Sequence, residues 1–413
     1  MRTQKKFLVY AVVILIGFSF FINSHAKPKS LPLTRTSPCS ISTLPIDVVY
    51  TWVNGSDPVF LKQLAKQDTK RSDTAEDTAQ SRFQDFNQLL YSLRSVELYA
   101  PWVNRVFIVT NGQVPYWLNE THATIVTHDK IFDDPSHLPT FNSPAIEAHF
   151  HSIPDLAENF IYFNDDISLT GPMCPSDFVS ADAGFTVRSS GKQYSFLKDN
   201  FFPPAKCSSL CLGKRGNGVC DQTCNTVNCL YDGNECGDQL PPSDGRPSWF
   251  GAVDFTLAML TERLGRFSPL DIQHMPQMMN KRILANLNKY FGQYYNETSS
   301  HHTRQRNEVQ TQIAYNNWLV AAPASSNVNV DKQLYQSTLV DVVDWRYVGY
   351  GAGTVDDAQE QLRITLRDIA QIKLLCVNDL INYSLEYESE QKMFIVQNFY
   401  EKLFSNKSKY ERS

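Results

Sequence analysis

The feature that most constrains this 413-residue chain is a cluster of cysteines. Six of its nine cysteines lie between Cys207 and Cys236. A segment this short cannot bury enough apolar surface to fold alone, so covalent cross-links must replace the missing core. Such a density of cysteines is typical of a disulfide-stapled module in an oxidising compartment. The sequence therefore predicts a small cross-linked unit inserted in a larger protein.

The N-terminus agrees with an oxidising compartment. Basic residues precede an apolar run at 7–22, whose length lies between that of a signal-peptide core and a short membrane span. By the positive-inside rule we expect a cytosolic tail at 1–6, a signal-anchor helix at 7–23 and a stem at 24–45. A signal peptide cleaved after Ala26 is the alternative. In either case the rest of the chain enters the secretory lumen, which suits the Asn-X-Ser/Thr sequons at Asn119, Asn296, Asn382 and Asn406.

Composition excludes one large class of function. Hydrophobic residues make up 42% of the chain and charged residues 20%, as in a folded globular protein. The net charge is −5 and the isoelectric point is about 6.0. Because a nucleic-acid binder needs a basic stripe, we expect no nucleic-acid partner.

The order of apolar segments predicts an α/β sheet with a good share of parallel strands. Strand-like runs fall at 46–53, 105–110, 124–128 and 160–163, and a helix-spaced pattern at 86–100 separates the first two. Each run ends in small and polar residues. In open α/β sheets, ligands bind beyond the carboxyl ends of the strands, so we expect a binding crevice there. Residues 241–413 are predicted to be mostly helical.

The fourth strand-like run ends in Asn164-Asp165-Asp166, where two adjacent carboxylates repel each other. Either this is a solvated turn, or a metal or substrate binds here. Neighbouring side chains on a strand point to opposite faces, so both aspartates reach one ligand only if the strand has already ended. We expect the strand to end at Phe163, with one aspartate facing the ligand and the other orienting the acceptor or a neighbouring loop.

The cysteine segment CSSLCLGKRGNGVCDQTCNTVNCLYDGNEC resembles a Lin-12/Notch repeat. That resemblance implies the disulfides Cys207–Cys229, Cys211–Cys224 and Cys220–Cys236. It also implies a calcium ion held by oxygen atoms of Asn217, Asp232 and Glu235. The family usually has aspartate where this chain has Glu235. A disulfide knot without metal is the alternative.

The segments IDVVYTWVNGSDP, HLPTFNSPAIEAHFHSI, IYFNDD, HMPQMMNKRI and LLCVNDLI resemble the Stealth family of sugar-phosphate transferases. The resemblance implies a GT-A-like, Rossmann-type α/β catalytic core, split by the Notch-type repeat and completed by a mostly helical C-terminal half. We expect the two parts of the core at 46–200 and 241–413 and the repeat at 201–240. Together with the N-terminus, this suggests a type II single-pass protein of the Golgi membrane with a lumenal catalytic part.

The implied reaction transfers a sugar 1-phosphate from a UDP-sugar to a hydroxyl and releases UMP. For Stealth members with a Notch-type repeat, the expected donor sugar is N-acetylglucosamine and the expected acceptor is the 6-hydroxyl of mannose on high-mannose glycoproteins. Such chemistry needs a divalent metal on the diphosphate, a cationic side chain and a base. Two alternatives remain: a metal-dependent glycosyltransferase that releases UDP, and a non-catalytic ectodomain in which the repeat mediates contacts. A homodimer is possible.

The resemblance also assigns roles to residues of the crevice. Asp47 would hold uracil or ribose, Trp52 would form a wall unless it is plain core, and Gly55 would let the backbone approach phosphate. Arg94 is a further candidate for a phosphate contact. The expected substrate-binding residues are Asp47, Trp52, Asn54, Gly55, Ser56, Arg82, Asn111, Gly112, Gln113 and Asn378.

Four residues are expected to act in catalysis. His274 is our first choice for the general base, because an imidazole with a near-neutral pKa suits proton removal from a hydroxyl. Asp166 and Glu147 are rivals for that role, and Glu147 is also expected to bind sugar hydroxyls. Arg304 would neutralise phosphate charge. Mg²⁺ or Mn²⁺ is expected on Asp165, Asp166 and Asp379. The pairing of Cys39, Cys174 and Cys376 stays open.

Overall fold

The structure is a computed structural model, and it describes residues 39, 45–67, 80–180, 184–189, 207–237, 239–241, 248–265, 267–325, 337–341, 345–349, 354–379 and 386–412. These residues belong to one compact unit that begins at Cys39.

The centre of the unit is a five-stranded sheet with the order β3-β2-β1-β4-β8. Strands β1 (Ile46–Thr51), β2 (Val106–Thr110), β3 (Ala123–Thr127) and β4 (Asn159–Asn164) are parallel. Their near-continuous apolar runs are typical of parallel strands that are buried on both faces. The predicted parallel-rich α/β fold is therefore confirmed.

Strand β8 (Gln277–Asn280) closes the sheet and runs antiparallel to β4. This direction matters, because the start of β8 then lies beside the carboxyl end of β4, with Gln277 opposite Tyr162. Residues just before β8 are thereby brought to the edge of the sheet where ligands bind in such folds.

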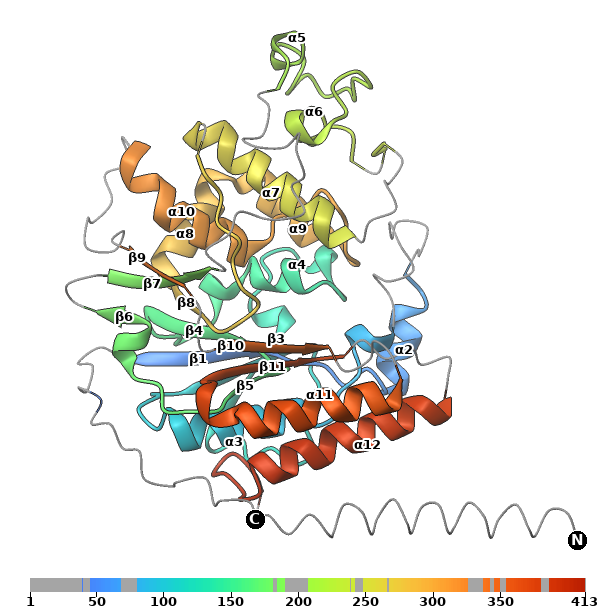
Figure 1. The fold of residues 1–413 in the computed structure, drawn as a ribbon. Helices are drawn as coiled ribbons and strands as arrows, with labels where there is room; N and C mark the ends of the chain where they lie inside the picture. The colour runs from blue at the N-terminus through green and yellow to red at the C-terminus, as the bar shows by residue number, and fades with distance from the viewer. Residues whose placement is uncertain are drawn as a thin grey trace, which may run out of the picture. The chain divides into compact units, whose positions relative to one another are not determined.

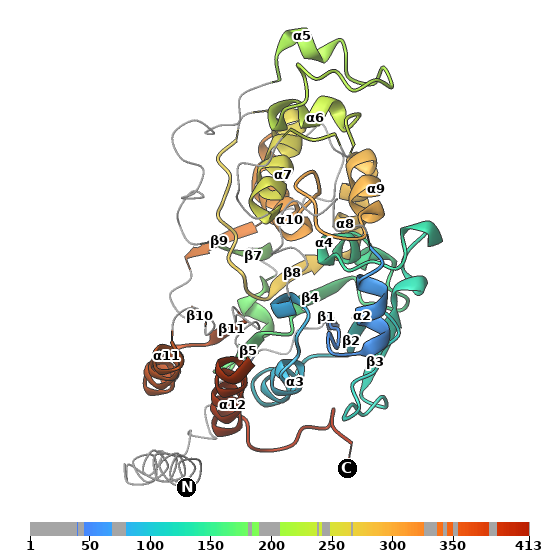
Figure 2. The same cartoon turned by 90° about the vertical axis from the view of Figure 1, so that its right-hand side faces the viewer.

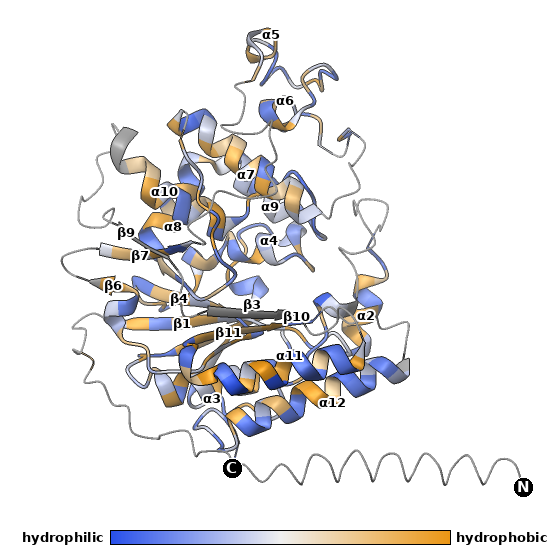
Figure 3. Ribbon diagram, viewed as in Figure 1, coloured by the Kyte–Doolittle hydropathy of each residue, from blue (hydrophilic) through white to orange (hydrophobic). Residues whose placement is uncertain are grey.

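Helices cover both faces of this sheet (Figures 1 and 2). On one side lie α3 (Gln88–Tyr99), α11 (Val355–Asp368) and α12 (Glu386–Leu403). On the other lie α7 (Ser248–Leu264), α8 (Lys281–Tyr290), α9 (Gly292–Ser300) and α10 (Thr311–Ser325). Helices α11 and α12 carry both hydrophilic and hydrophobic residues (Figure 3), as expected of helices that cover a core on one side. Two short helices, α2 (Pro58–Leu64) and α4 (Ser143–Glu147), complete this set.

Two small sheets extend the core. One has the order β10-β11-β5, from strands β10 (Trp345–Gly349), β11 (Leu374–Asn378) and β5 (Ile167–Leu169). The other has the order β6-β7-β9, from strands β6 (Val179–Ser180), β7 (Gly184–Ser189) and β9 (Ser337–Asp341). The C-terminal half is mainly helical, as predicted, but it also supplies strands to all three sheets. Within this half, α11 stops at Asp368 and Leu374 begins β11.

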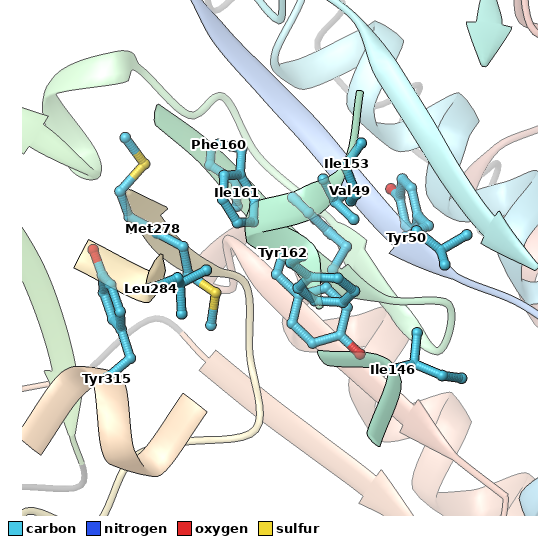
Figure 4. Packing of buried hydrophobic residues seen from close by; sticks show 14 of the residues in the cluster. Val49, Tyr50, Ile146, Ile153, Phe160, Ile161, Tyr162, Met278, Leu284 and Tyr315 are labelled. Carbon is cyan, nitrogen blue, oxygen red and sulfur yellow. The ribbon is translucent and has the colours of Figure 1, made fainter. Parts of the chain in front are cut away.

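The largest buried cluster is built around β4 (Figure 4). Phe160 and Ile161 lie among Met278 of β8 and Leu284 of α8, and Val49 of β1 belongs to the same cluster. Strand β4 extends to Asn164, one residue beyond the expected end, and Asp165-Asp166 form the turn into β5.

The cysteine module holds two short helices, α5 (Ser209–Leu212) and α6 (Leu230–Gly233). Its disulfides are Cys207–Cys229, Cys211–Cys224 and Cys220–Cys236, the pairs that the Notch-type resemblance implies. A fourth disulfide joins Cys39 to Cys174, and Cys376 is free and buried.

The module is docked on the helical face of the core. Arg215 forms an ion pair with Glu262 of α7 at 2.9 Å, and the Tyr231 ring stacks on Phe255 of the same helix. Asn234 accepts a hydrogen bond from Asn307 at 3.1 Å. Leu230, Tyr231 and Cys236 therefore belong to the main hydrophobic cluster rather than to a separate one.

The membrane prediction has to be corrected. Within the described ranges, no helix combines the length and the apolar character needed to cross a bilayer. This contradicts the predicted type II single-pass membrane protein. The apolar segment at 7–23, on which that prediction rested, and the tail and stem on either side of it at 1–6 and 24–38 lie outside the described residues.

Candidate active site

A cavity of about 390 Å³ opens at the carboxyl ends of β1, β2 and β4. The cavity is formed by segments far apart in sequence. They are the residues after β1 and β4, helix α4, His274 shortly before β8, the loop after α9 and the end of β11. Of the residues predicted from sequence, the cavity is lined by Trp52, Arg82, Asn111, Glu147, Asp165, Asp166, His274, Arg304, Asn378 and Asp379.

Asp166 is the residue on which these segments converge. Its Oδ2 accepts hydrogen bonds from Asn378 Nδ2 at 2.9 Å and from the Cys376 thiol at 3.3 Å. Its backbone oxygen accepts from Val377 N at 3.0 Å. Strand β11 pairs with β5 next to this turn, with Cys376 opposite Ile167, and that pairing brings the C-terminal residues to the aspartate. The other oxygen, Oδ1, is buried and has no hydrogen-bond partner among the described residues.

His274 stands at the rim of the cavity, and its side chain is 41% exposed. Its Nε2 lies 3.5 Å from Asp166 Oδ2 and 3.1 Å from Asn164 Nδ2. The surrounding protein disfavours a charged imidazole, but the Asp166 carboxylate outweighs this and raises the pKa of His274. Burial raises the pKa of Asp166 in turn, yet His274 and the hydrogen bonds from Asn378 and Cys376 bring it below its usual value. The two side chains form a carboxylate–imidazole pair.

Asp165 occupies a different electrostatic environment. Burial raises its pKa well above the usual value, and the nearby carboxylates of Asp166 and Asp85 add to the effect. Asp85 accepts a hydrogen bond from Trp52 Nε1 at 2.9 Å. Trp52 therefore fixes the position of this carboxylate, and it also lines the cavity. Three acidic side chains thus gather near the turn that follows β4, where a cation would relieve their repulsion.

Glu147 and Arg304 also line the cavity, on α4 and on the loop after α9. Burial raises the pKa of Glu147 to about 7, although Arg304 and the hydrogen bonds from Gln312 and Tyr162 act in the opposite direction. Tyr162 donates to Glu147 Oε1 at 3.3 Å. Arg304 donates to Ser143 at 2.8 Å, at the first turn of α4. A carboxyl that titrates near neutral pH suits acid–base chemistry.

One predicted substrate contact is wrong. Asp47 is the second residue of β1, at the amino end of the strand, whereas the cavity lies at the carboxyl ends. It is fully buried and accepts hydrogen bonds from Asn104, Arg105 and the amide of Ala157. A strand's two ends lie at opposite edges of the sheet, so Asp47 is structural and does not hold uracil or ribose.

The loop after β1 also differs from its predicted role. Asn54 N donates to Gln113 Oε1 at 2.8 Å, and Gln113 Nε2 donates to the Asn54 carbonyl at 3.2 Å. These hydrogen bonds join the loops that follow β1 and β2. Gly55 N donates to the Phe83 carbonyl, and a Cβ on Gly55 would collide with that carbonyl. The glycine therefore serves a close backbone approach within the protein and not an approach to phosphate. Asn54, Gly55, Ser56, Gly112 and Gln113 are not among the residues that line the cavity.

Arg94 is likewise structural. It donates to Glu411 at 2.7 Å and to the carbonyl of Phe404, on the side of α3 that faces the C-terminal segment. Arg82, by contrast, lines the cavity.

Several cavity residues were missed from sequence. Gln312 forms a hydrogen bond with Glu147. Trp249 is the second residue of α7, and His128 directly follows β3. Cys376 belongs to LLCVND, a segment that the Stealth resemblance singled out, but the cysteine was considered only for disulfide pairing. Asp85, which lies near the cavity, carried no signal of its own in the sequence, because its partner Trp52 comes from the distant loop after β1.

The donors present fit a divalent cation at Asp166. A buried carboxylate oxygen without a partner is costly unless a ligand satisfies it, and hard cations prefer such oxygens. Asp165 and Asp379 line the same cavity and would be the further oxygen ligands.

The calcium ligands expected in the cysteine module fit only in part. Asp232 Oδ1 is buried without a partner, as an ion ligand would be. Both oxygens of Glu235, however, accept backbone hydrogen bonds from Gly216 and Gly218. Asn217 Oδ1 accepts from Val219 N at 2.8 Å. The calcium ion therefore stays a prediction.

The chain matches conserved region 1 of Stealth proteins at residues 44–71, conserved region 2 at 82–187 and conserved region 3 at 273–321. Residues 204–237 match the LNR domain, the Notch-type repeat. Asp166 and Glu147 fall in region 2, and His274 and Arg304 fall in region 3.

Among curated proteins, the chain is similar to the N-acetylglucosamine-1-phosphotransferase subunits alpha/beta of Mus musculus, with 46% identity over 164 residues, which is 39% of this chain and 12% of the mouse protein. An exopolysaccharide phosphotransferase of Streptomyces coelicolor is 28% identical over 403 residues, covering 96% of this chain and 63% of the relative. A capsular polysaccharide phosphotransferase of Actinobacillus pleuropneumoniae is 42% identical over 161 residues, which is 37% of this chain and 43% of the relative.

These relatives are sugar phosphotransferases, which supports sugar-phosphate transfer as the general chemistry of the site. The chain spans less than two thirds of the length of each of them, and only a small part of the mouse protein. Bacterial proteins match at identities similar to that of the mouse protein, which contradicts the predicted Golgi location.

Proposed function

The chain carries the three Stealth conserved regions in order and is a member of the Stealth family, and from this premise we propose that it transfers a sugar 1-phosphate from a UDP-sugar to a glycan hydroxyl and releases UMP. One observation carries the proposal: the pair of Asp166 and His274 lies in one cavity with Asp165, Arg82 and Arg304. Acidic residues for a cation and arginines for phosphate are the combination that a diphosphate donor requires.

The cavity divides the work between two groups of residues. Asp166, with Asp165 and Asp379, would hold Mg²⁺ or Mn²⁺. Such a cation would neutralise charge on the donor diphosphate and the leaving UMP. Arg304, and Arg82 on the segment before α3, would bind phosphoryl oxygens, because a guanidinium offers several donors in a fixed plane.

A proton must leave the attacking hydroxyl, and His274 is our first assignment for its acceptor. The ring is held by Asp166 and Asn164 at the rim of the cavity, where an acceptor glycan has access. A carboxylate that orients an imidazole and stabilises its charged form is an established way to make it a base. Glu147, whose pKa is about 7, is the alternative base and otherwise a hydrogen-bond partner for sugar hydroxyls.

For the substrates, we propose N-acetylglucosamine 1-phosphate as the transferred group and the 6-hydroxyl of a mannose on a high-mannose glycoprotein as the acceptor. The name of the 46% identical mouse relative and the inserted LNR domain support this choice. The polysaccharide phosphotransferases among the relatives make a polysaccharide acceptor the rival.

The test uses UDP-N-acetylglucosamine labelled with ³²P at the β-phosphate. The purified protein is incubated with donor and either a high-mannose glycoprotein or a polysaccharide acceptor, with and without EDTA. We expect label in the glycan product, unlabelled UMP, and no reaction with EDTA. Label in released UDP would establish a glycosyltransferase instead. No turnover of any UDP-sugar with either acceptor would favour a non-catalytic ectodomain.

A further inference from the structure

Cys376 is the one cysteine of the nine that is not in a disulfide, and it lies next to Asp166 of the candidate active site. It is fully buried in β11, and its thiol donates to Asp166 Oδ2 at 3.3 Å. His274 Nε2 lies 3.5 Å from the same oxygen. The sulfur, an imidazole nitrogen and a carboxylate oxygen of these three residues all lie within 4.8 Å of one another.

This mixture of donors does not match the cation that a diphosphate substrate prefers. Mg²⁺ and Ca²⁺ take oxygen ligands almost exclusively, whereas thiolate and imidazole select zinc and other soft cations. Zinc sites with three protein ligands, drawn from cysteine, histidine and carboxylate, keep a fourth position for water or substrate.

A second observation points to a ligand at the same place. Asp166 is only 8% exposed, and its Oδ1 is buried without a hydrogen-bond partner. Asn378, on the same strand as Cys376, already occupies Oδ2 together with the thiol. The free oxygen is thus available to a cation without breaking the hydrogen bond that Asn378 makes.

We propose that Asp166, His274 and Cys376 form a site for Zn²⁺, which overlaps the position of the hard cation and makes the protein sensitive to inhibition by zinc. On binding, the thiol proton passes to solvent, an S–Zn bond replaces the S–H···O contact to Asp166, and the histidine binds through neutral imidazole. No oxidant or reductant is needed. A divalent cation supplies the charge that permits a buried thiol to ionise.

The inhibitory part rests on the proposed function, but the binding part does not. Metal binding is therefore measured on the full chain in the absence of any donor, and transfer is measured separately. If zinc binds and no transfer occurs with any donor, the proposed function fails and the site stands. If transfer occurs and no sulfur ligand is found, the site fails and the proposed function stands.

The experiment is a titration of the metal-free protein with Co²⁺, followed by absorption spectroscopy. We expect a thiolate-to-cobalt charge-transfer band that saturates near one equivalent, disappears on addition of Zn²⁺ and persists in a large excess of Mg²⁺. Disulfide sulfurs cannot give this band, so it reports Cys376 alone. The Cys376→Ser variant should lack the band, and His274→Gln should weaken Co²⁺ binding by about tenfold or more.

Absence of the band in the unmodified protein, or an identical spectrum in Cys376→Ser, would overturn the proposal. A measurement that needs no variant guards against misfolding of the serine substitution: X-ray absorption at the zinc edge should show one sulfur at about 2.3 Å. A shell of nitrogen and oxygen only would refute the site as firmly as the missing cobalt band.

Discussion

Asp47 and Asp166 are buried carboxylates at opposite edges of the same sheet, and they differ in how they are satisfied. Asp47 is the second residue of β1, and Asp166 follows the end of the neighbouring parallel strand β4. Asp47 accepts three hydrogen bonds from nearby residues, and both of its oxygens have partners. Oδ2 of Asp166 accepts two hydrogen bonds, whereas its buried Oδ1 has no hydrogen-bond partner in the described part of the chain.

This contrast shows that burial of a charge does not by itself mark a functional residue. A carboxylate whose oxygens both accept hydrogen bonds from the surrounding protein stabilises the fold. It has no oxygen left to bind a substrate or cation. A carboxylate with an unfilled oxygen, beside a histidine and at the ligand-binding edge of the sheet, keeps capacity for a substrate or cation. The same distinction separates Arg94, which is paired with Glu411, from Arg304 in the cavity.

The largest effect is expected from a matched pair of isosteric substitutions. Asp166→Asn removes the charge at the reaction centre and should lower kcat/KM by about 10³-fold or more with little loss of folded protein. Asp47→Asn should leave kcat/KM of the folded fraction within about threefold, because the expected 10³-fold losses belong to residues that contact the reacting groups. Steady-state transfer assays with circular dichroism as the folding control measure both. Equal losses of activity in the two variants would break the comparison.

The arginine pair should give the next largest effect. Arg304→Ala removes a charge near the donor phosphates and should reduce kcat/KM by about 10²-fold. Arg94→Ala breaks a largely buried ion pair with Glu411, so it should cost about 3 kcal/mol of unfolding free energy and leave kcat/KM of the folded protein unchanged. Denaturant unfolding and transfer assays on both variants measure this. If Arg94→Ala lost activity and Arg304→Ala did not, the placement of the site would be wrong.

Asp47→Ala sharpens the structural half of the comparison. It leaves the buried amide of Ala157 without its acceptor and deprives the exposed Asn104 of a partner, which should lower the free energy of unfolding by about 2 to 3 kcal/mol. Asp165→Ala, at the other edge, should instead raise stability at neutral pH, because burial and two neighbouring carboxylates disfavour its charge. Urea denaturation at pH 7 compares them. A larger loss in Asp165→Ala would contradict this account of the two edges.

Glu147 gives the smallest of these effects, through pH. Its folded pKa of about 7 lies above the usual 4.5, so the folded state holds this proton more tightly than the unfolded state. The resulting stabilisation is complete below pH 4.5 and is lost as pH rises through 7. Relative to the unmodified protein, Glu147→Gln should therefore gain up to about 3 kcal/mol between pH 4 and pH 8. Denaturant unfolding at both pH values tests this, and a pH-independent difference would rule it out.

Much of the framework is predictable from the sequence, for physical reasons. Buried parallel strands need continuous apolar runs, and these located all four parallel strands to within two residues. Polar residues after those runs located the cavity, because the carboxyl ends of parallel strands share one edge. The Notch-type resemblance implied the three disulfides of the cysteine module, whereas the pairing of Cys39 with Cys174 was left open.

What the sequence did not reveal depends on contacts between distant segments. Asp47 was predicted to bind substrate from the Stealth resemblance. Its actual partners precede other strands of the sheet and are Asn104, Arg105 and Ala157. Gly55 looked like a phosphate-binding glycine, and only the position of Phe83 shows that it makes room for the protein itself. The position of Cys376 beside Asp166 results from the pairing of β11 with β5, which the sequence did not reveal.

The most direct test of the central claim, that reaction takes place at the carboxyl edge of the sheet around Asp166, is a crystal structure with Mn²⁺ and a non-hydrolysable UDP-sugar. Anomalous diffraction locates manganese independently of the protein atoms. We predict a manganese peak within coordination distance of the Asp166 carboxylate, with the diphosphate between it and Arg304. A donor bound at the Asp47 edge, or a manganese–diphosphate pair remote from Asp166, would contradict the account.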